Sequence, residues 1–200
     1  MKSNVCRIDK GKADLVAILK ESEKVAVYND LSPKQAMQLR LICEEMDGML
    51  PHIVGKFNGN FWIEFIDGVC KVNASIKISD LNSGRKKNMI GISSDGKNAS
   101  ATGIIGSIRN AIENFFLNED AYMSSFASSS HSIHSSTQYS EYTGYSYKWS
   151  LEDYKGSVKK KEEQVAWDEL EKSVISSVAD DVIVGVKGDQ ADIIIVKKFV

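Results

Sequence analysis

Two stretches of this chain carry residue types that could support chemistry: a group of carboxylates inside a predicted helix, and a glycine-rich loop with a lysine. In the first stretch Glu44 and Glu45 fall in the middle of the helix. On a helical wheel, Glu45 shares a shoulder beside the apolar stripe with Met49 and His52. An ordinary wet helix face, with Glu44 paired to Arg40, explains the same carboxylates equally well.

The second stretch is a polar, glycine-rich loop over residues 95–106 that runs directly into a predicted amphipathic helix. Lys97 and the backbone N–H groups near the start of that helix could hold a phosphate group. The loop does not match the P-loop pattern, because Asn98 stands where a serine or threonine is needed. An ordinary glycine-rich connection is at least as good an interpretation of the loop.

The histidines and cysteines predict neither a metal centre nor a nucleophilic triad. Cys6, Cys43 and Cys70 are odd in number and widely spaced among apolar neighbours, which is typical of reduced structural thiols in a cytoplasmic protein. His131 and His134 lie in a serine tract without carboxylate or thiol neighbours. We therefore expect no metal site.

Composition bounds the class of protein. With 200 residues and 42% hydrophobic residues, the chain is long enough and apolar enough for one domain with a real core. A net charge of -2 and a pI near 6.0 argue against a nucleic-acid binder. No stretch reads as a membrane span or a signal-peptide core, so we expect a cytoplasmic protein without a membrane partner.

The longest predicted element is a helix over residues 31–54. Ser32 and Gln35 form a capping box with Pro33 at the first helical position, which predicts where this helix begins. Gly55 is the expected C-terminal cap. Apolar residues then recur at helical spacing as one buried stripe: Ala36, Leu39, Cys43, Met46, Leu50 and Ile53.

The remaining patterns predict helices and antiparallel hairpins. Strands over 61–65 and 69–78 are joined by the two-residue turn Asp67-Gly68. A capping box from Ser150 to Asp153, flanked by Trp149 and Tyr154, predicts another helix start. We also expect an edge strand over 5–8, a helix over 13–28, a strand over 89–93, a helix over 104–116, an apolar stripe at Trp167, Leu170, Val174 and Val178, and a hairpin of 182–186 with 193–196.

The order of these elements favours an α+β fold. We expect a two-layer sandwich with helices on one face of a mixed, mainly antiparallel sheet. Residues 120–148 are rich in serine and tyrosine and predict a flexible insertion. The helix and hairpin of 149–200 are expected to complete a single domain that spans 1–200.

The helix motif over residues 41–49, followed later by Gly103 and Gly106 at the start of a helix, resembles the histidine-kinase-like (Bergerat, GHKL) ATPase domain. The nearest-looking branch is the bacterial anti-sigma-factor serine kinases. The resemblance covers roughly 26–116 and implies a Bergerat-like sandwich. It also implies that Glu45 is the acidic residue that acts as general base or positions water. Gly103 and Gly106 would face the phosphates of a nucleotide.

Two departures from that family bear on the cofactor. Met49 stands where the family has its magnesium-binding asparagine, and a thioether cannot replace an amide oxygen on a hard cation. The family's adenine-binding box is also missing, because the region 76–84 has one aspartate and one glycine at the wrong spacing. We therefore expect ATP or ADP, if bound, to contact Lys97, Asn98 and the two glycines, without magnesium.

Three functions follow as hypotheses. The favoured one is a degenerate histidine-kinase-like domain that acts as a regulatory or partner-binding module, with weak or no nucleotide binding. The second is an active ATP-dependent anti-sigma-type serine kinase or ATPase. The third is a purely structural interaction domain that forms a homodimer through an exposed hairpin edge. The first and third predict a protein partner, and none of the three involves nucleic acid or membrane.

Overall fold

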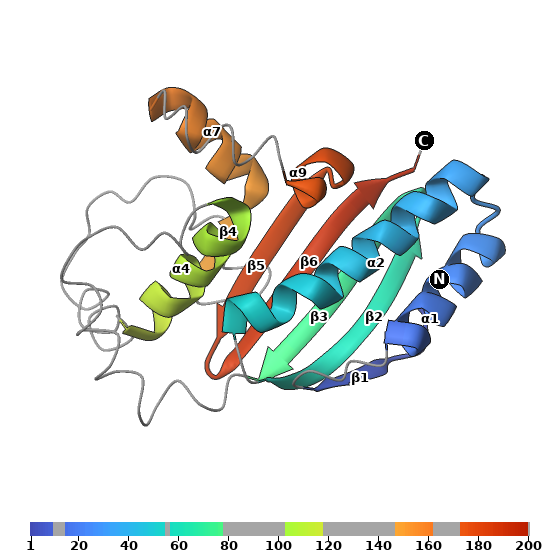
Figure 1. Cartoon of the computed structure of the whole chain (residues 1–200), viewed down its shortest axis with the longest axis horizontal. Coiled ribbons are helices and arrows are strands. Elements are labelled where there is room, and N and C mark those ends of the chain that lie inside the picture. The colour runs from blue at the N-terminus through green and yellow to red at the C-terminus, as the bar shows by residue number, and fades with distance from the viewer. Residues whose placement is uncertain (10–14, 55–56, 78–102, 118–146, 162–172, 200) are drawn as a thin grey trace.

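The computed structural model describes residues 1–9, 15–54, 57–77, 103–117, 147–161 and 173–199 (Figure 1). The strands are β1 Cys6–Asp9, β2 Asn58–Ile66, β3 Val69–Lys77, β4 Tyr147–Ser150, β5 Asp181–Lys187 and β6 Gln190–Lys198. The helices are α1 Leu15–Tyr28, α2 Pro33–Val54, α4 Gly103–Leu117, α7 Leu151–Lys161 and α9 Val174–Val178. Several predicted features lie outside the described residues: Gly55, the strand over 89–93, Lys97 and Asn98, nearly all of the insertion, and Trp167 and Leu170.

One six-stranded sheet in the order β1-β2-β3-β6-β5-β4 forms a single layer, and α2 crosses its middle (Figure 1). The expected two-layer α+β class is confirmed. The expectation of a mixed sheet is wrong for the described strands, because every pairing among them is antiparallel. The hairpins also do not supply exposed edges, since β3 pairs with β6 in the centre and the edge strands are β1 and β4.

The two halves of the sheet repeat the same topology. Each half consists of a short edge strand, helices, and a hairpin whose first strand pairs with that edge strand. The last strands of the halves, β3 and β6, pair along their whole length in a register centred on Asn73 and Ile194. The C-terminal hairpin is therefore an interior part of the sheet.

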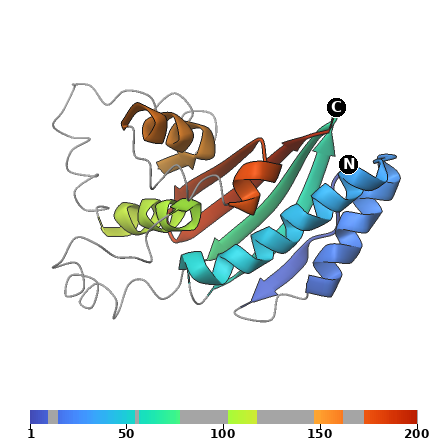
Figure 2. The ribbon, with the colours of Figure 1, turned by 45° about the horizontal axis from the view of Figure 1, so that its top comes forward.

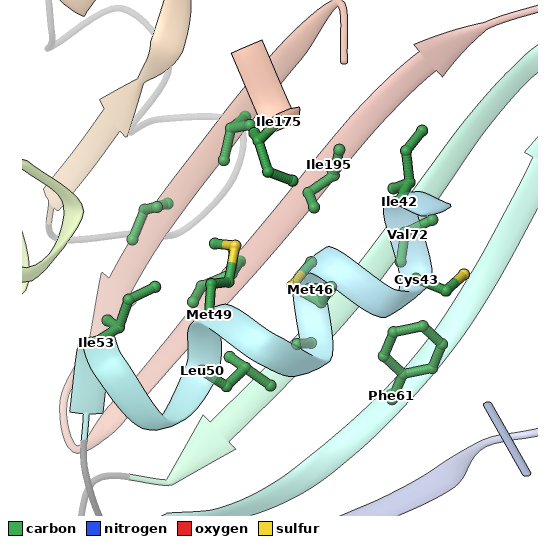
Figure 3. Packing of buried hydrophobic residues seen from close by; sticks show 14 of the residues in the cluster. Ile42, Cys43, Met46, Met49, Leu50, Ile53, Phe61, Val72, Ile175 and Ile195 are labelled. Carbon is green, nitrogen blue, oxygen red and sulfur yellow. The ribbon is translucent and has the colours of Figure 1, made fainter. Parts of the chain in front are cut away.

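Helix α2 begins as predicted. The N–H of Ser32 donates to Gln35 Oε1 at 2.9 Å, and the N–H of Gln35 donates to Ser32 Oγ at 3.4 Å, which completes the capping box. Arg40 pairs with Glu44 on the solvent side at 3.1 Å, in agreement with the alternative interpretation of this part of the helix as an ordinary wet face. The buried surface of α2 is wider than the predicted stripe: it comprises Leu39, Ile42, Cys43, Met46, Met49, Leu50, Ile53 and Val54 (Figure 3).

Both predicted hairpins are confirmed, and the strands of the second are longer than predicted. Asp67 and Gly68 have φ values of 49° and 76°, the left-handed conformation that a type I′ turn requires at both central positions. In the second hairpin Lys187 pairs with Gln190, which leaves a two-residue turn that begins at Gly188. Gly188 also has a positive φ, of 57°, and this is where glycine is favoured over other residues.

The C-terminal half differs from expectation in two places. The capping box of α7 is present, with the Asp153 N–H donating to Ser150 Oγ at 3.1 Å, but residues 147–150 form β4, so the insertion does not extend to 148. A separate five-residue helix, α9, begins after its N-cap Ser173. In this helix Ile175 is buried, whereas Val174, predicted to be part of an apolar stripe, is 40% exposed.

Candidate functional site

The predicted site residues of the described chain come from α2 and α4, two helices that pack against each other. Glu45 is half-buried on the flank of α2 that also carries Ile42 and Met49. Figure 3 shows the Met49 side chain pointing towards the region of Ile175 in α9. Within the described part of the chain, Glu45 forms no hydrogen bond or ion pair. It is therefore a carboxylate at the rim of the core without a fixed polar partner there.

Glu45, Met49 and His52 share one flank of α2, as the helical wheel predicted, but they differ in burial. The Met49 side chain is only 3% exposed and belongs to the hydrophobic core, while His52 is exposed. The reason is that α2 contacts the sheet below it and also α1, α4 and α9 beside it, so more than a narrow stripe is covered. Of the three predicted neighbours, Met49 therefore lies in the core, Glu45 at the edge of the core and His52 in solvent.

Gly103 and Gly106 form the first turn of α4. Gly103 has a φ of 77°, which glycine adopts without steric cost, and it starts the helix. Gly106 is buried, as are Ile104 and Ile108. The start of α4 is thus packed into the core. An anion would have to use the N–H groups of this first turn. These two glycines are the part of the predicted phosphate loop that the structure places.

Asp47 is another half-buried carboxyl group on α2, and it was not among the predicted site residues. Burial raises the pKa of Asp47 above its ordinary value. Residues two apart on a helix point in different directions, so Asp47 and Glu45 lie on opposite flanks of α2 and do not form a catalytic carboxylate pair. The sequence signal for Asp47 is its position on the helical wheel beside Cys43 and Leu50. Both belong to the predicted apolar stripe, so a carboxyl group next to them is expected to be partly buried.

The three cysteines are free thiols, as predicted. Burial raises the pKa of Cys43 well above its ordinary value and that of Cys70 to about 12. Both thiols are therefore protonated and unreactive near neutral pH. Among the described residues, no group of three or more histidine, cysteine or acidic side chains is arranged to hold a metal ion.

Among the carboxylates of the described residues, Glu21 on α1 accepts the largest number of side-chain and main-chain hydrogen bonds, and its role is structural. Glu21 is buried and accepts hydrogen bonds from the Asn4 main-chain N–H at 3.0 Å, from the Asn4 amide at 3.2 Å and from Lys24 at 2.6 Å. Burial by itself raises the pKa of Glu21, but the hydrogen bonds from Lys24 and Asn4 outweigh it and hold the pKa below its ordinary value. Glu21 thereby ties the N-terminal segment to α1.

This arrangement predicts a pH-dependent contribution to stability. Because the folded-state pKa of Glu21 is lowered, its contribution is fully present above the unfolded value of about 4.5 and is lost as the pH falls through the folded value. Glu21→Gln should cost about 1–3 kcal/mol at pH 7. Urea unfolding of both proteins between pH 7 and pH 3.5 should show this difference shrinking at the acid end. A difference that is constant with pH would contradict the role of the charge.

Among the described helices, none combines the length and apolar character that a membrane crossing requires. The described residues thus show a packed α2–α4 pair with Glu45 at its rim, a buried Met49, and structural roles for Glu21 and the buried thiols. No family model, no curated protein and no solved structure matches the chain.

Proposed function

We propose that this chain is a regulatory or partner-binding module that does not turn over nucleotide. The observation that carries the proposal is the position of Met49. In the histidine-kinase-like domains that the sequence resembles, the corresponding asparagine binds magnesium. Here the side chain is a thioether inside an apolar core that includes Met46, Ile53 and Ile195, and it offers no ligand to a hard cation.

The finer fold assignment, a degenerate Bergerat-like domain, is part of this proposal. It is supported by the long helix α2, the hairpin that follows it, and a helix α4 that starts at Gly103 and packs beside α2. The all-antiparallel sheet differs from the mixed sheet that we expected. We therefore base the function on the residues of the site and not on the fold class.

Any remaining nucleotide binding in this proposal uses anion recognition. Lys97 and Asn98 of the glycine-rich loop, together with N–H groups at the start of α4 near Gly103 and Gly106, would attract the phosphates of ATP or ADP. These groups do not need a metal ion to do so. Binding should therefore be weak and insensitive to magnesium.

Partner binding is supported by apolar side chains on the surface of the α1–α2 hairpin. Val16, Val27, Tyr28 and Met37 are each between 61% and 78% exposed. On α1, Val16 and Val27 lie on the outward side, opposite the buried residues of that helix. Large apolar side chains that gather on one surface mark sites of protein–protein contact more often than single exposed ones do.

Isothermal titration with ATP and ADP, with and without magnesium, tests the nucleotide part of this proposal. We expect a dissociation constant near the millimolar range that magnesium does not change, and no hydrolysis. Lys97→Ala should weaken binding about fivefold, equivalent to ~1 kcal/mol for one charged contact. Glu45→Ala is the matched control and should leave binding unchanged. Magnesium-stimulated hydrolysis that Glu45→Ala abolishes would instead establish the alternative function, an ATP-dependent kinase or ATPase.

A further inference from the structure

The helices leave one face of the sheet uncovered by the described chain. Figure 2 shows α1, α2, α4 and α9 gathered on one side of the strands. Every strand residue of the hydrophobic core belongs to that side, because the buried positions alternate along β2, β3, β5 and β6 in matching register. We call the other side of the sheet the open face.

Apolar side chains cross the middle of the open face. The strand register places Trp62, Asn73, Ile194 and Ile183 side by side on β2, β3, β6 and β5, and we call this set the central row. Trp62, Ile194 and Ile183 are half-buried and are not part of the core cluster. A sheet face that is exposed to water normally carries polar residues, so this row is unusual for a solvated surface.

The one polar member of the central row is held down against the strands. Asn73 is 5% exposed, and its amide nitrogen donates to the main-chain oxygens of Lys71 at 2.9 Å and Trp62 at 3.4 Å. Its protons are therefore used within the chain. The surface that the row presents outward is formed by the isoleucines and the tryptophan.

From these observations we propose that a second copy of this chain covers the open face, so that two sheets pack face to face in a symmetric dimer. The area of the sheet is suitable for a dimer interface. The six strands have four to nine residues each, and with a rise of ~3.3 Å per residue and a spacing of ~4.8 Å between strands the sheet covers about 670 Å². This area approaches the ~800 Å² that each partner contributes to a standard stable interface.

The charges beside the central row select the orientation of the second copy. On one side the register places Glu64, Lys71, Val196 and Asp181, and on the other side Asn60, Ser75, Asp192 and Gly185. If the two-fold axis of the dimer runs along the central row, each strand lies over the same strand of the partner. Each of the two flanking rows then lies over the partner's opposite flanking row. Glu64 then faces Asn60 and Lys71 faces Ser75, so no like charges meet. An axis parallel to the strands would place Glu64 over Asp181, which are both acidic.

The rim of the face is polar and internally bonded, as the rim of an interface usually is. Lys2 pairs with Glu64 at 3.2 Å and its ammonium group lies 4.8 Å from the centre of the Trp62 ring. Gln190 donates to Asp192 at 2.9 Å and to Ser75 at 3.0 Å. These contacts pair several of the charged and polar groups around the apolar centre with one another.

Sedimentation equilibrium of the full chain between 1 and 100 µM tests the dimer. We expect the wild type to be dimeric and Ile194→Lys, which places a lysine at the centre of the interface, to raise the dimer dissociation constant more than ~100-fold. Val174→Lys, at a position on α9 that is 40% exposed and on the helix side of the sheet, is the matched control and should stay dimeric. A monomeric wild type, or an Ile194→Lys protein that still dimerises, would overturn the proposal.

A second pair of variants tests the orientation at an exposed position, where folding is not at risk. Asn60 faces Glu64 of the partner in the proposed dimer, so Asn60→Lys should tighten the dimer and Asn60→Glu should weaken it, each by about threefold. Equal effects of the two variants would contradict the proposed axis. Acrylamide quenching of tryptophan fluorescence, compared between the wild type and Trp62→Phe, measures how exposed Trp62 is. A monomeric wild type in which Trp62 is shielded from acrylamide would show that the chain covers its own open face, and this result would also overturn the dimer.

Discussion

A chain that ends after Phe116 is expected to be insoluble or molten. This truncation removes β4, β5 and β6, and with them the partner along the whole length of β3. It leaves a nine-residue strand as a new edge and uncovers core residues that pack on β6, including Met49. Because a domain is stable by only ~5–15 kcal/mol, losing half of the sheet exceeds what the remaining contacts can supply.

Near-UV circular dichroism and dye binding provide the measurement for this truncation. The fragment should lack fixed aromatic signals and should bind a hydrophobic dye. The full chain in the same buffer should show the aromatic signals and should not bind the dye. A soluble fragment of 1–116 that unfolds cooperatively would show that the N-terminal half of the repeated topology is an independent domain.

Met46→Ala is expected to destabilise the protein more than Glu21→Gln does. Met46 is 0% exposed at the centre of α2, and its truncation leaves a cavity between the helix and the sheet (Figure 3). The expected loss is about 2–5 kcal/mol of unfolding free energy. Met37→Ala is the matched control, because it makes the same chemical change on the same helix at a residue that is 71% exposed.

Urea unfolding of the two methionine variants distinguishes the effect of side-chain burial from the effect of the methionine-to-alanine change itself. Met37→Ala should lie within about 0.5 kcal/mol of the wild type. If the two variants lost similar amounts of stability, α2 would not be packed as described. A large loss from Met37→Ala alone would indicate that the exposed end of α2 is covered by a partner.

The features that depend on a few neighbouring residues were predictable from the sequence alone. The capping boxes at Ser32 and Ser150 and the turn at Asp67-Gly68 all appear in the structure as predicted. Each is determined by contacts within about four residues, so the local pattern contains all the information that is needed. The two-layer α+β class followed from the alternation of such elements.

Which strands pair and what covers each helix depend on contacts between residues far apart in the chain. The antiparallel β3–β6 pair joins residues far apart in the chain, and no local pattern specifies it. The same applies to the site: Met49 is buried, Glu45 lies at the rim of the core and Asp47 has a raised pKa because of what packs around α2 from other parts of the chain. A helical wheel gives the direction of a side chain, but its burial depends on the neighbours that folding brings to that side.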